Sequence, residues 1–313
     1  MPTAASALIR TWSKPPVPNH GALALVSLLA AIAAAYIVRW WVLERRRAVA
    51  GILRRPRPSD LLVGFITNFF DTLGIGSFAP TTAWFKLRAR MPDEEIPGTL
   101  NSGQALPTMT QALIFIATVS VDLTTLTSMI AAAVLGAWLG VGLVSRLSRR
   151  AIQLGMGVAL LCAALLFLAA NLGWMPGGGE ALGLTGSRLI FAVAANAVLG
   201  ALMMLGVGLY APCLILVSLL GMSPLAAFPI MMGSCGLLMP VGGARFIRTG
   251  RYNFTAAVGL ALGGIPGVLV AAYVVKSLPI IWLRWLVLIV VLYAAVQMLK
   301  AARRRIAAPA PPA

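Results

Sequence analysis

The chain carries one short stretch twice: Leu73-Gly74-Ile75-Gly76-Ser77-Phe78-Ala79-Pro80 and, 132 residues later, Leu205-Gly206-Val207-Gly208-Leu209-Tyr210-Ala211-Pro212. The same offset relates Ser102 to Ser234. Glycine and proline are common in membrane helices and at close helix contacts, which is enough to explain a single Gly-x-Gly pattern. Two matching copies at one offset are better explained by an internal repeat whose two halves are broken at the same place.

The composition shows that a bilayer is the solvent for most side chains. Of 313 residues, 60% are hydrophobic and 11% charged, and the mean hydropathy is +0.92. A soluble chain carries roughly 25% charged residues, and one soluble core of ordinary size cannot hide this much apolar surface. These values exclude a soluble enzyme, a disordered protein and a secreted disulfide scaffold. The three cysteines lie in apolar segments without metal-ligand spacing, so we expect neither a metal site nor a cofactor.

Apolar segments long enough to cross a bilayer occur along most of the chain. The predicted single spans are Gly21–Leu43, Thr99–Val119, Thr125–Val144, Ala151–Ala170, Leu225–Gly243, Phe254–Val275 and Ile281–Leu299. Two further apolar stretches, Leu61–Phe85 and Leu189–Leu220, contain the repeated glycine and proline residues.

The basic residues define the topology. Of the 25 Lys and Arg residues, 20 fall in alternate loops, at 39–57, 86–90, 146–150, 245–251 and 300–305. Because positive loops stay in the cytoplasm, the N-terminus is predicted outside and the C-terminus inside. The alternative for the first apolar segment is a signal peptide cleaved near Ala33-Ala34-Ala35, but cleavage there would export the arginine-rich loop at 39–57.

This topology makes each broken stretch a hairpin. The stretch at 61–85 begins and ends inside, and the stretch at 189–220 begins and ends outside. The sequence does not decide whether the limbs cross fully. We therefore predict an all-α polytopic membrane protein with two inverted-topology repeats that contain broken, hairpin helices, plus one extra N-terminal transmembrane helix. The predicted parts are a tail, helix and basic loop (1–60), a first repeat (61–170), an extracytoplasmic linker (171–188), a second repeat (189–300) and a cytoplasmic tail (301–313).

Inverted repeats broken at matching places are typical of secondary transporters. Both halves contain, in this order, a Gly-rich break with a following Pro, a Ser-containing segment and a Gly-x-x-x-Gly helix. The last pattern is Gly136…Gly140 in the first half and Gly263…Gly267 in the second. Over about residues 61–300 the chain resembles the TauE/SafE sulfite exporter family, also called the toluene-sulfonate uptake permease family. The usual triple glycine of that family is reduced here to two glycines in each break.

The resemblance implies transport of sulfite, organosulfonates or related sulfur-containing anions, driven by the proton gradient or the membrane potential. We expect a multi-pass protein of the bacterial inner membrane whose partners are a small anion and the lipid bilayer, with a proton as candidate coupling ion. No nucleic-acid partner is expected, because no basic face alternates with stacking aromatic residues.

An anion at mid-membrane needs hydrogen-bond donors, and helix N-termini and glycine turns supply free backbone N–H groups. The candidate substrate-binding residues are Asn68, Gly74, Gly76, Ser77, Asn101, Ser102, Gln104, Asn196, Gly206, Gly208, Ser234 and Cys235. The alternative for the small and amide residues among them is helix packing with interhelical hydrogen bonds.

Asp71 is the one acidic residue inside an apolar stretch, and the other seven are assigned to loops. A carboxylate within the membrane is a functional candidate, so Asp71 is predicted to couple transport to protons; the alternative is that it caps the next helix. Arg245, Arg248 and Arg251 crowd one inside loop and are candidates for steering the anion. Their alternative role is to set topology and to bind lipid headgroups.

An intramembrane enzyme is not expected. The single histidine, His20, lies in the polar N-terminal tail, no His-Glu-x-x-His pattern is present, and Asp71 has no second membrane carboxylate as partner. An anion channel or a membrane assembly factor without coupled transport remains the alternative, because repeats and broken helices do not separate these from a transporter.

Overall fold

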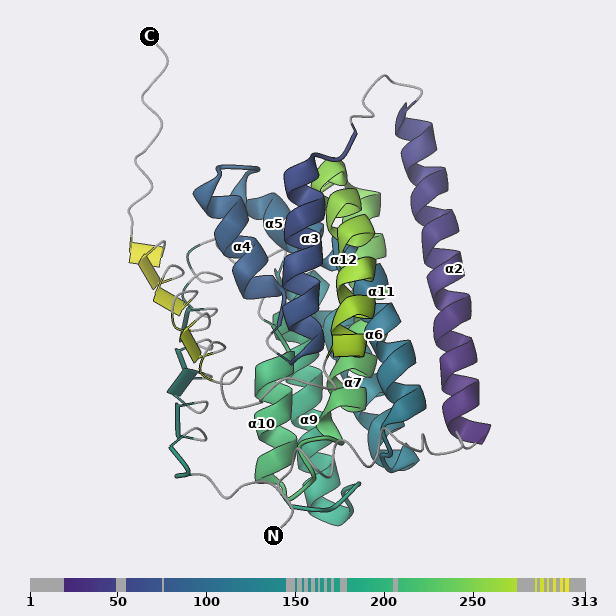
Figure 1. Ribbon diagram of the computed structural model, residues 1–313, viewed down its shortest axis with the longest axis vertical. Helices are drawn as coiled ribbons and strands as arrows, with labels where there is room; N and C mark the ends of the chain where they lie inside the picture. The colour runs from purple at the N-terminus through teal and green to yellow at the C-terminus, as the bar shows by residue number, and fades with distance from the viewer. Residues whose placement is uncertain are drawn as a thin grey trace.

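The computed structural model is a bundle of helices (Figure 1). It describes residues 20–48, 55–74, 76–144, 172–174, 179–204 and 208–274, with scattered residues between 150 and 169 and between 285 and 303. Over these residues there is no β-strand. The elements are α2 (His20–Ala48), α3 (Pro58–Thr72), α4 (Phe78–Leu87), the 3₁₀ turn η1 (Asp93–Glu95), α5 (Ile96–Gly103), α6 (Ala105–Thr118), α7 (Leu123–Val144), α9 (Gly186–Met203), α10 (Tyr210–Leu219), α11 (Ala227–Thr249) and α12 (Phe254–Val274).

Five helices in the described part of the chain, α2, α7, α9, α11 and α12, are long and apolar enough to cross a membrane. The shorter α6 is apolar as well. The prediction of an all-helical, multi-pass membrane protein is therefore confirmed. The predicted spans Ala151–Ala170 and Ile281–Leu299 lie mostly outside the described residues.

Each glycine-broken stretch folds as a hairpin, α3 with α4 and α9 with α10. α4 and α10 have 10 residues each, about 15 Å of helix against a hydrocarbon core about 30 Å thick. In Figure 1 α3 and α4 occupy the upper half of the bundle and α9 and α10 the lower half, with the breaks toward the middle. The second limb of each hairpin, as a helix, is thus too short to cross the hydrocarbon core.

Closely packed helix pairs hold the hairpins. α3 lies along α12, α9 lies along α7, and α11 packs against α5, α6 and α7 at the centre. A Cβ atom at Gly263 would meet the carbonyl of Leu61, and one at Gly136 would meet the carbonyl of Ala197. Small residues let helix backbones approach this closely, so both Gly-x-x-x-Gly patterns are packing faces.

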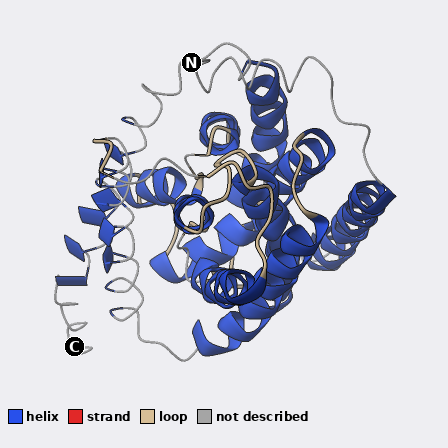
Figure 2. Ribbon diagram, turned by 90° about the horizontal axis from the view of Figure 1, so that it is seen from below, coloured by secondary structure: helices blue, strands red, loops and turns tan. Residues whose placement is uncertain are grey.

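One face of α2 ties this helix to the bundle. The Tyr36 hydroxyl donates to the carbonyl of Ser102 at 3.1 Å. The Trp40 indole N–H donates to the Tyr252 hydroxyl at 3.0 Å, which donates to Glu44 at 2.6 Å. The three α2 residues are four apart and form one stripe, and Figure 2 shows this helix at the right-hand edge of the bundle.

The predicted single span Thr99–Val119 consists of two helices in the structure, α5 and α6, divided at Gln104. Pro107 causes the division. It has no N–H to donate to the carbonyl of Gly103, four residues earlier, and its ring crowds that carbonyl.

The assignment of all acidic residues except Asp71 to loops is wrong. Glu44 lies in α2, and Asp60 lies in the first turn of α3, fully buried. The Arg90 side chain donates to the two carboxylate oxygens of Asp60 from Nε at 3.2 Å and from Nη2 at 2.6 Å. This bidentate pair joins the outer ends of α3 and α4 and closes the hairpin opposite its break.

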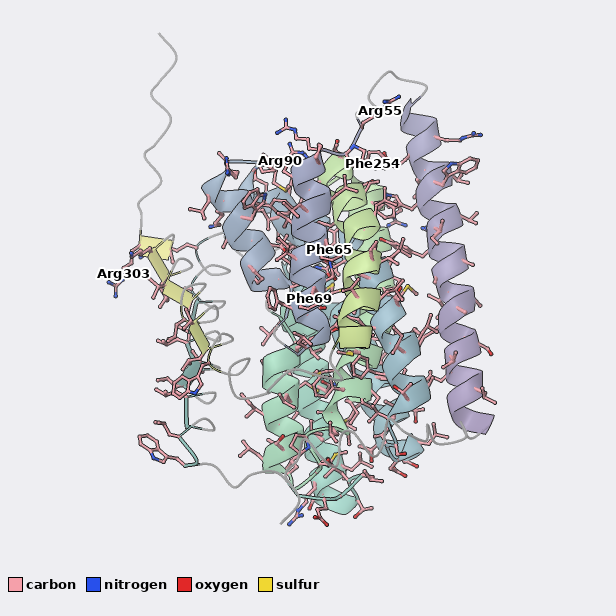
Figure 3. The ribbon with its side chains drawn as sticks, viewed as in Figure 1. Arg55, Phe65, Phe69, Arg90, Phe254 and Arg303 are labelled. Carbon is pink, nitrogen blue, oxygen red and sulfur yellow. The ribbon has the colours of Figure 1, made fainter. Side chains whose placement is uncertain are left out.

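The two ends of the bundle carry different loops. Figure 3 shows Arg55, Arg90 and the start of α12 at Phe254 at the upper end. At the other end a Cβ atom at Gly21 would meet Leu123 at the start of α7. This separation agrees with the predicted alternation of loops, whereas the side of the membrane each end faces stays a prediction.

Candidate functional site

The first hairpin break is built by glycine and closed by Asp71. Gly74 and Gly76 have φ angles of +89° and +85°, a left-handed conformation that glycine adopts without a steric penalty. Asp71 lies buried near the end of α3 and accepts a hydrogen bond from the backbone N–H of Ser77, which precedes the first residue of α4. Asp71 therefore bridges the break by accepting from the residue that precedes α4.

Asp71 also takes part in a contact that the sequence did not reveal. Gln111 of α6 donates from Nε2 to Oδ2 of Asp71 at 2.9 Å and to Oγ1 of Thr72 at 3.0 Å. The Oε1 atom of Gln111 accepts a hydrogen bond from the Tyr210 hydroxyl. All four side chains are buried.

Tyr210 extends these hydrogen bonds from the first break to the second. It is the first residue of α10, and in the repeated stretch it stands where the first copy has Phe78. A hydroxyl at the second break thus reaches, through one amide, the carboxylate at the first break. Asp71, Gln111 and Tyr210 thus connect the two breaks by hydrogen bonds.

Open space lies beside a glycine of each break. An ideal Cβ atom built on Gly76 or on Gly208 has no heavy atom of the described residues within 4 Å, whereas one on Gly74 lies 3.5 Å from the ring of Phe228. Gly206 lies outside the described residues. Of the three break glycines that the structure describes, Gly76 and Gly208 are therefore the two with free space beside the backbone.

A second polar cluster lies in the first half of the chain. Asn68 of α3 donates to Oε1 of Gln104, and Nε2 of Gln104 donates to Oγ1 of Thr81 at 3.4 Å. Gly264 of α12 lies against the Asn68 amide, because a Cβ atom there would be 2.5 Å from Nδ2. The cluster joins α3, α4 and α12 at the division between α5 and α6.

The second half has a comparable amide contact. Asn196 of α9 donates to the carbonyl of Met129 at 2.7 Å and to Oγ of Ser234 at 3.1 Å. Cys235, next to Ser234, lies with its sulfur 3.4 Å from that of Met203. In both halves an asparagine on the first limb of the hairpin thus reaches the helix that follows the hairpin.

Asn101 and Ser102 lie apart from the hydrogen bonds that join Asp71, Gln111 and Tyr210. Asn101 donates to the carbonyl of Pro97 at 2.9 Å, and Ser102 reaches the carbonyl of Gly243 at 3.5 Å. The Oδ1 atoms of Asn68, Asn101 and Asn196 are buried without a partner among the described residues. Each of these oxygens can accept a hydrogen bond from water or from a ligand.

The three loop arginines are not part of this site. Arg245 and Arg248 are exposed at the end of α11, and Arg251 is exposed just after it. A Cβ atom at Gly98 of α5 would meet the backbone carbonyl of Arg251, so these arginines lie near the start of α5 and not at the breaks. Among the described residues no group of three His, Cys, Asp or Glu side chains is placed to hold a metal ion.

The sequence contains a pattern that points to Gln111, although the hydropathy of the segment does not show it. Gln104, Thr108 and Gln111 are spaced by four and three residues and so share one helix face, which is polar within an apolar segment. All three are fully buried. Tyr210 had no comparable local signal, because its partner lies 99 residues away along the chain.

Comparison with known proteins agrees with the resemblance drawn from the sequence. A family model described as "Sulfite exporter TauE/SafE" matches residues 2–167, more than half of the chain. The matched range includes α2 and the first hairpin with Asp71, and it overlaps the resemblance over 61–300 from residue 61 to 167. No curated protein and no solved structure matched the chain. The chain therefore belongs to the sulfite exporter TauE/SafE family, a family of membrane transporters.

Proposed function

We propose that the protein is a secondary transporter that carries sulfite, an organosulfonate or a related sulfur-containing anion across a bacterial inner membrane. The anion binds at mid-membrane between the two hairpin breaks. The observation that carries this proposal is the hydrogen-bonded line from Tyr210 through Gln111 to Asp71, which joins the two breaks. The family supports a small anion as the substrate.

Two helix N-termini supply the binding energy for the anion. α4 begins at the first break and α10 begins at the second. The N–H groups in the first turn of a helix lack intrahelical acceptors and carry partial positive charge, so they attract an anion. Because Gly76 and Gly208 leave open space beside these two starts, the anion reaches both without displacing a side chain.

The two halves act as inverted repeats around this site. The hairpins lie toward opposite ends of the bundle (Figure 1), and each packs on a glycine-lined helix from the other half, α3 on α12 and α9 on α7. Residues 61–170 and 189–300 form the repeats, joined by the linker at 171–188. The segment 1–60 adds an outer helix, the tail at 301–313 lies in the cytoplasm, and the N-terminus lies outside.

Asp71 supplies the coupling to protons. An ionised carboxylate beside the anion site repels the anion, whereas a neutral carboxylic acid does not. The other buried carboxylates described here, Asp60 and Glu44, are held by Arg90 and Tyr252 at helix ends. Asp71 alone stands at a break, so anion binding and proton uptake are linked there.

Asp71→Asn tests the coupling. The variant keeps the shape and the acceptor for the Ser77 N–H but cannot titrate, so it loses accumulation driven by a pH gradient and keeps anion exchange. The assay is uptake into proteoliposomes with and without a pH gradient. Glu180→Gln, a neutralisation at an exposed position of the linker, serves as control and responds like wild type. A variant Asp71→Asn that follows the gradient like wild type would assign coupling to another residue or to voltage.

The substrate is identified by measuring the melting temperature of the purified protein in the presence of sulfite, thiosulfate, sulfate and several organosulfonates. A ligand that binds the folded state stabilises it by mass action. The transported anions raise the melting temperature of wild type. A melting temperature that none of these anions changes contradicts the proposed site.

A further inference from the structure

Gln111 bridges two groups of different chemistry with the two ends of one amide. Its Oε1 atom accepts from the Tyr210 hydroxyl, and its Nε2 group donates to Oδ2 of Asp71. An amide has an acceptor end and a donor end that are not interchangeable. Asp71 accepts from Gln111 and from the N–H of Ser77, and the hydroxyls of Ser77 and Tyr210 lie beside it as further donors, so this arrangement fits the ionised carboxylate.

A protonated Asp71 fits the opposite arrangement. Its O–H group is a donor and would face the donor end of the amide. A half-turn of the amide exchanges the two ends, so that Asp71 donates to Oε1 and Nε2 donates to the Tyr210 oxygen. Thr72, which donates to the carbonyl of Asn68 at 2.8 Å, can rotate its hydroxyl to donate to Oε1. Asp71, Thr72 and the Gln111 oxygen therefore have partners in both states.

We propose that Gln111 is a protonation-dependent amide switch: when Asp71 takes up a proton, the amide turns over and the Tyr210 hydroxyl stops donating to Gln111 and donates to the bound anion. The second half of this statement rests on the proposed function, which places the anion between the breaks. One proton passes from water to the carboxylate, Tyr210 keeps its own proton, and no other covalent bond changes. In this switch, protonation removes the negative charge of Asp71 and, in the same step, frees the Tyr210 hydroxyl to donate to the anion.

The groups around Asp71 show which of them takes up the proton on acidification. The titratable groups that face it in the described structure are Tyr210 on α10 and Cys235 on α11, with Cys213 beside Cys235. Tyrosine and cysteine ionise in alkaline solution, and α4 and α6 present no titratable group to Asp71 in the described residues. A change produced by acidification at this place therefore reports the protonation of Asp71.

The first test reads the tyrosine directly and needs no anion. The tyrosine doublet in an ultraviolet resonance Raman spectrum distinguishes a hydroxyl that donates from one that accepts. The chain has 5 tyrosines, so the signal of Tyr210 is the difference between wild type and Tyr210→Phe in lipid nanodiscs. Acidification shifts this signal from donor to acceptor in wild type and leaves it unchanged in Asp71→Asn. A wild-type signal that does not respond to pH, or an equal response in Asp71→Asn, overturns the switch.

The second test measures binding of methanesulfonate, whose charge does not change with pH. In acid, Tyr210→Phe weakens binding at least about tenfold, the loss of one hydrogen bond to a charged group, and in alkali it changes binding less than about twofold. In an Asp71→Asn background the loss is the same at both pH values. Tyr252→Phe removes a buried hydroxyl from the α2 contact and is the control, without effect on binding.

The outcomes separate the switch from the proposed function. A loss in Tyr210→Phe that is equal in acid and alkali overturns the switch while the anion site stands. A wild type that binds no sulfur anion at any pH contradicts the proposed site, and the tyrosine spectrum then decides the switch alone.

Discussion

Leucine in place of Gly208 adds bulk beside the second hairpin break without straining the backbone. Gly208 is not among the residues of positive φ, and no heavy atom of the described residues lies within 4 Å of its Cβ position. Because an added Cβ atom meets no obstacle there, we expect the free energy of unfolding to change by about 0.5 kcal/mol or less. Gly76→Leu differs, because at a φ of +85° a side chain costs about 1–2 kcal/mol.

Gly208→Leu instead weakens the binding of the anion. If the anion occupies the open space, the added side chain must be accommodated in a filled site, and such overpacking costs about 1–3 kcal/mol. Anion binding is then weakened about five- to 150-fold, and transport at low substrate concentration falls by the same factor.

The assay is sulfite uptake into proteoliposomes at matched protein content, together with the melting temperature of the same preparation. Gly142→Leu is the matched control, since it places the same side chain near the end of α7, away from the breaks, at a position whose Cβ atom would meet no heavy atom of the described residues within 4 Å. The variant at Gly208 loses transport at an unchanged melting temperature, and the control keeps both. Full transport by a folded Gly208→Leu protein refutes the placement of the anion.

Three further predictions concern the frame around the site. Arg90→Ala leaves the buried Asp60 carboxylate unpaired and lowers the free energy of unfolding by about 3–5 kcal/mol, measured by chemical unfolding; adding Asp60→Asn restores part of the loss, and an unchanged stability contradicts the pairing. Gly263→Ala pushes α12 away from the backbone of α3 and costs about 1–3 kcal/mol in the same assay, while a neutral result means that the helices can separate freely. Single cysteines at Ser120 and Thr249, in a background without native cysteines, are labelled from opposite sides of the membrane, and labelling of both from one side contradicts the inverted topology.

The long helices were predictable because each is one apolar run between polar turns. Thr125–Val144 and Phe254–Val275 were expected, and the structure has Leu123–Val144 and Phe254–Val274. Asp60 was misplaced for a related reason. A span defined by hydropathy excludes a polar first turn, although the proline at position 58 is typical of a helix start.

The site was predictable only in part. Asp71 was predicted as the one acidic residue inside an apolar stretch, and Ser77 and the two breaks were predicted from the repeated stretch. The partners of Asp71 were not found. Gln111 lies 40 residues from Asp71 and Tyr210 lies 99 from Gln111, and contacts over such distances are set by the packing of helices, which no local pattern contains.

Counterflow tests the central claim most directly. Proteoliposomes loaded with unlabelled sulfite are diluted into a trace of labelled sulfite without any ion gradient. A transporter that binds the anion between the two breaks accumulates label transiently above equilibrium, the accumulation saturates with concentration, and Gly208→Leu abolishes it. Label that only equilibrates, without overshoot and without saturation, would show a channel and contradict the account.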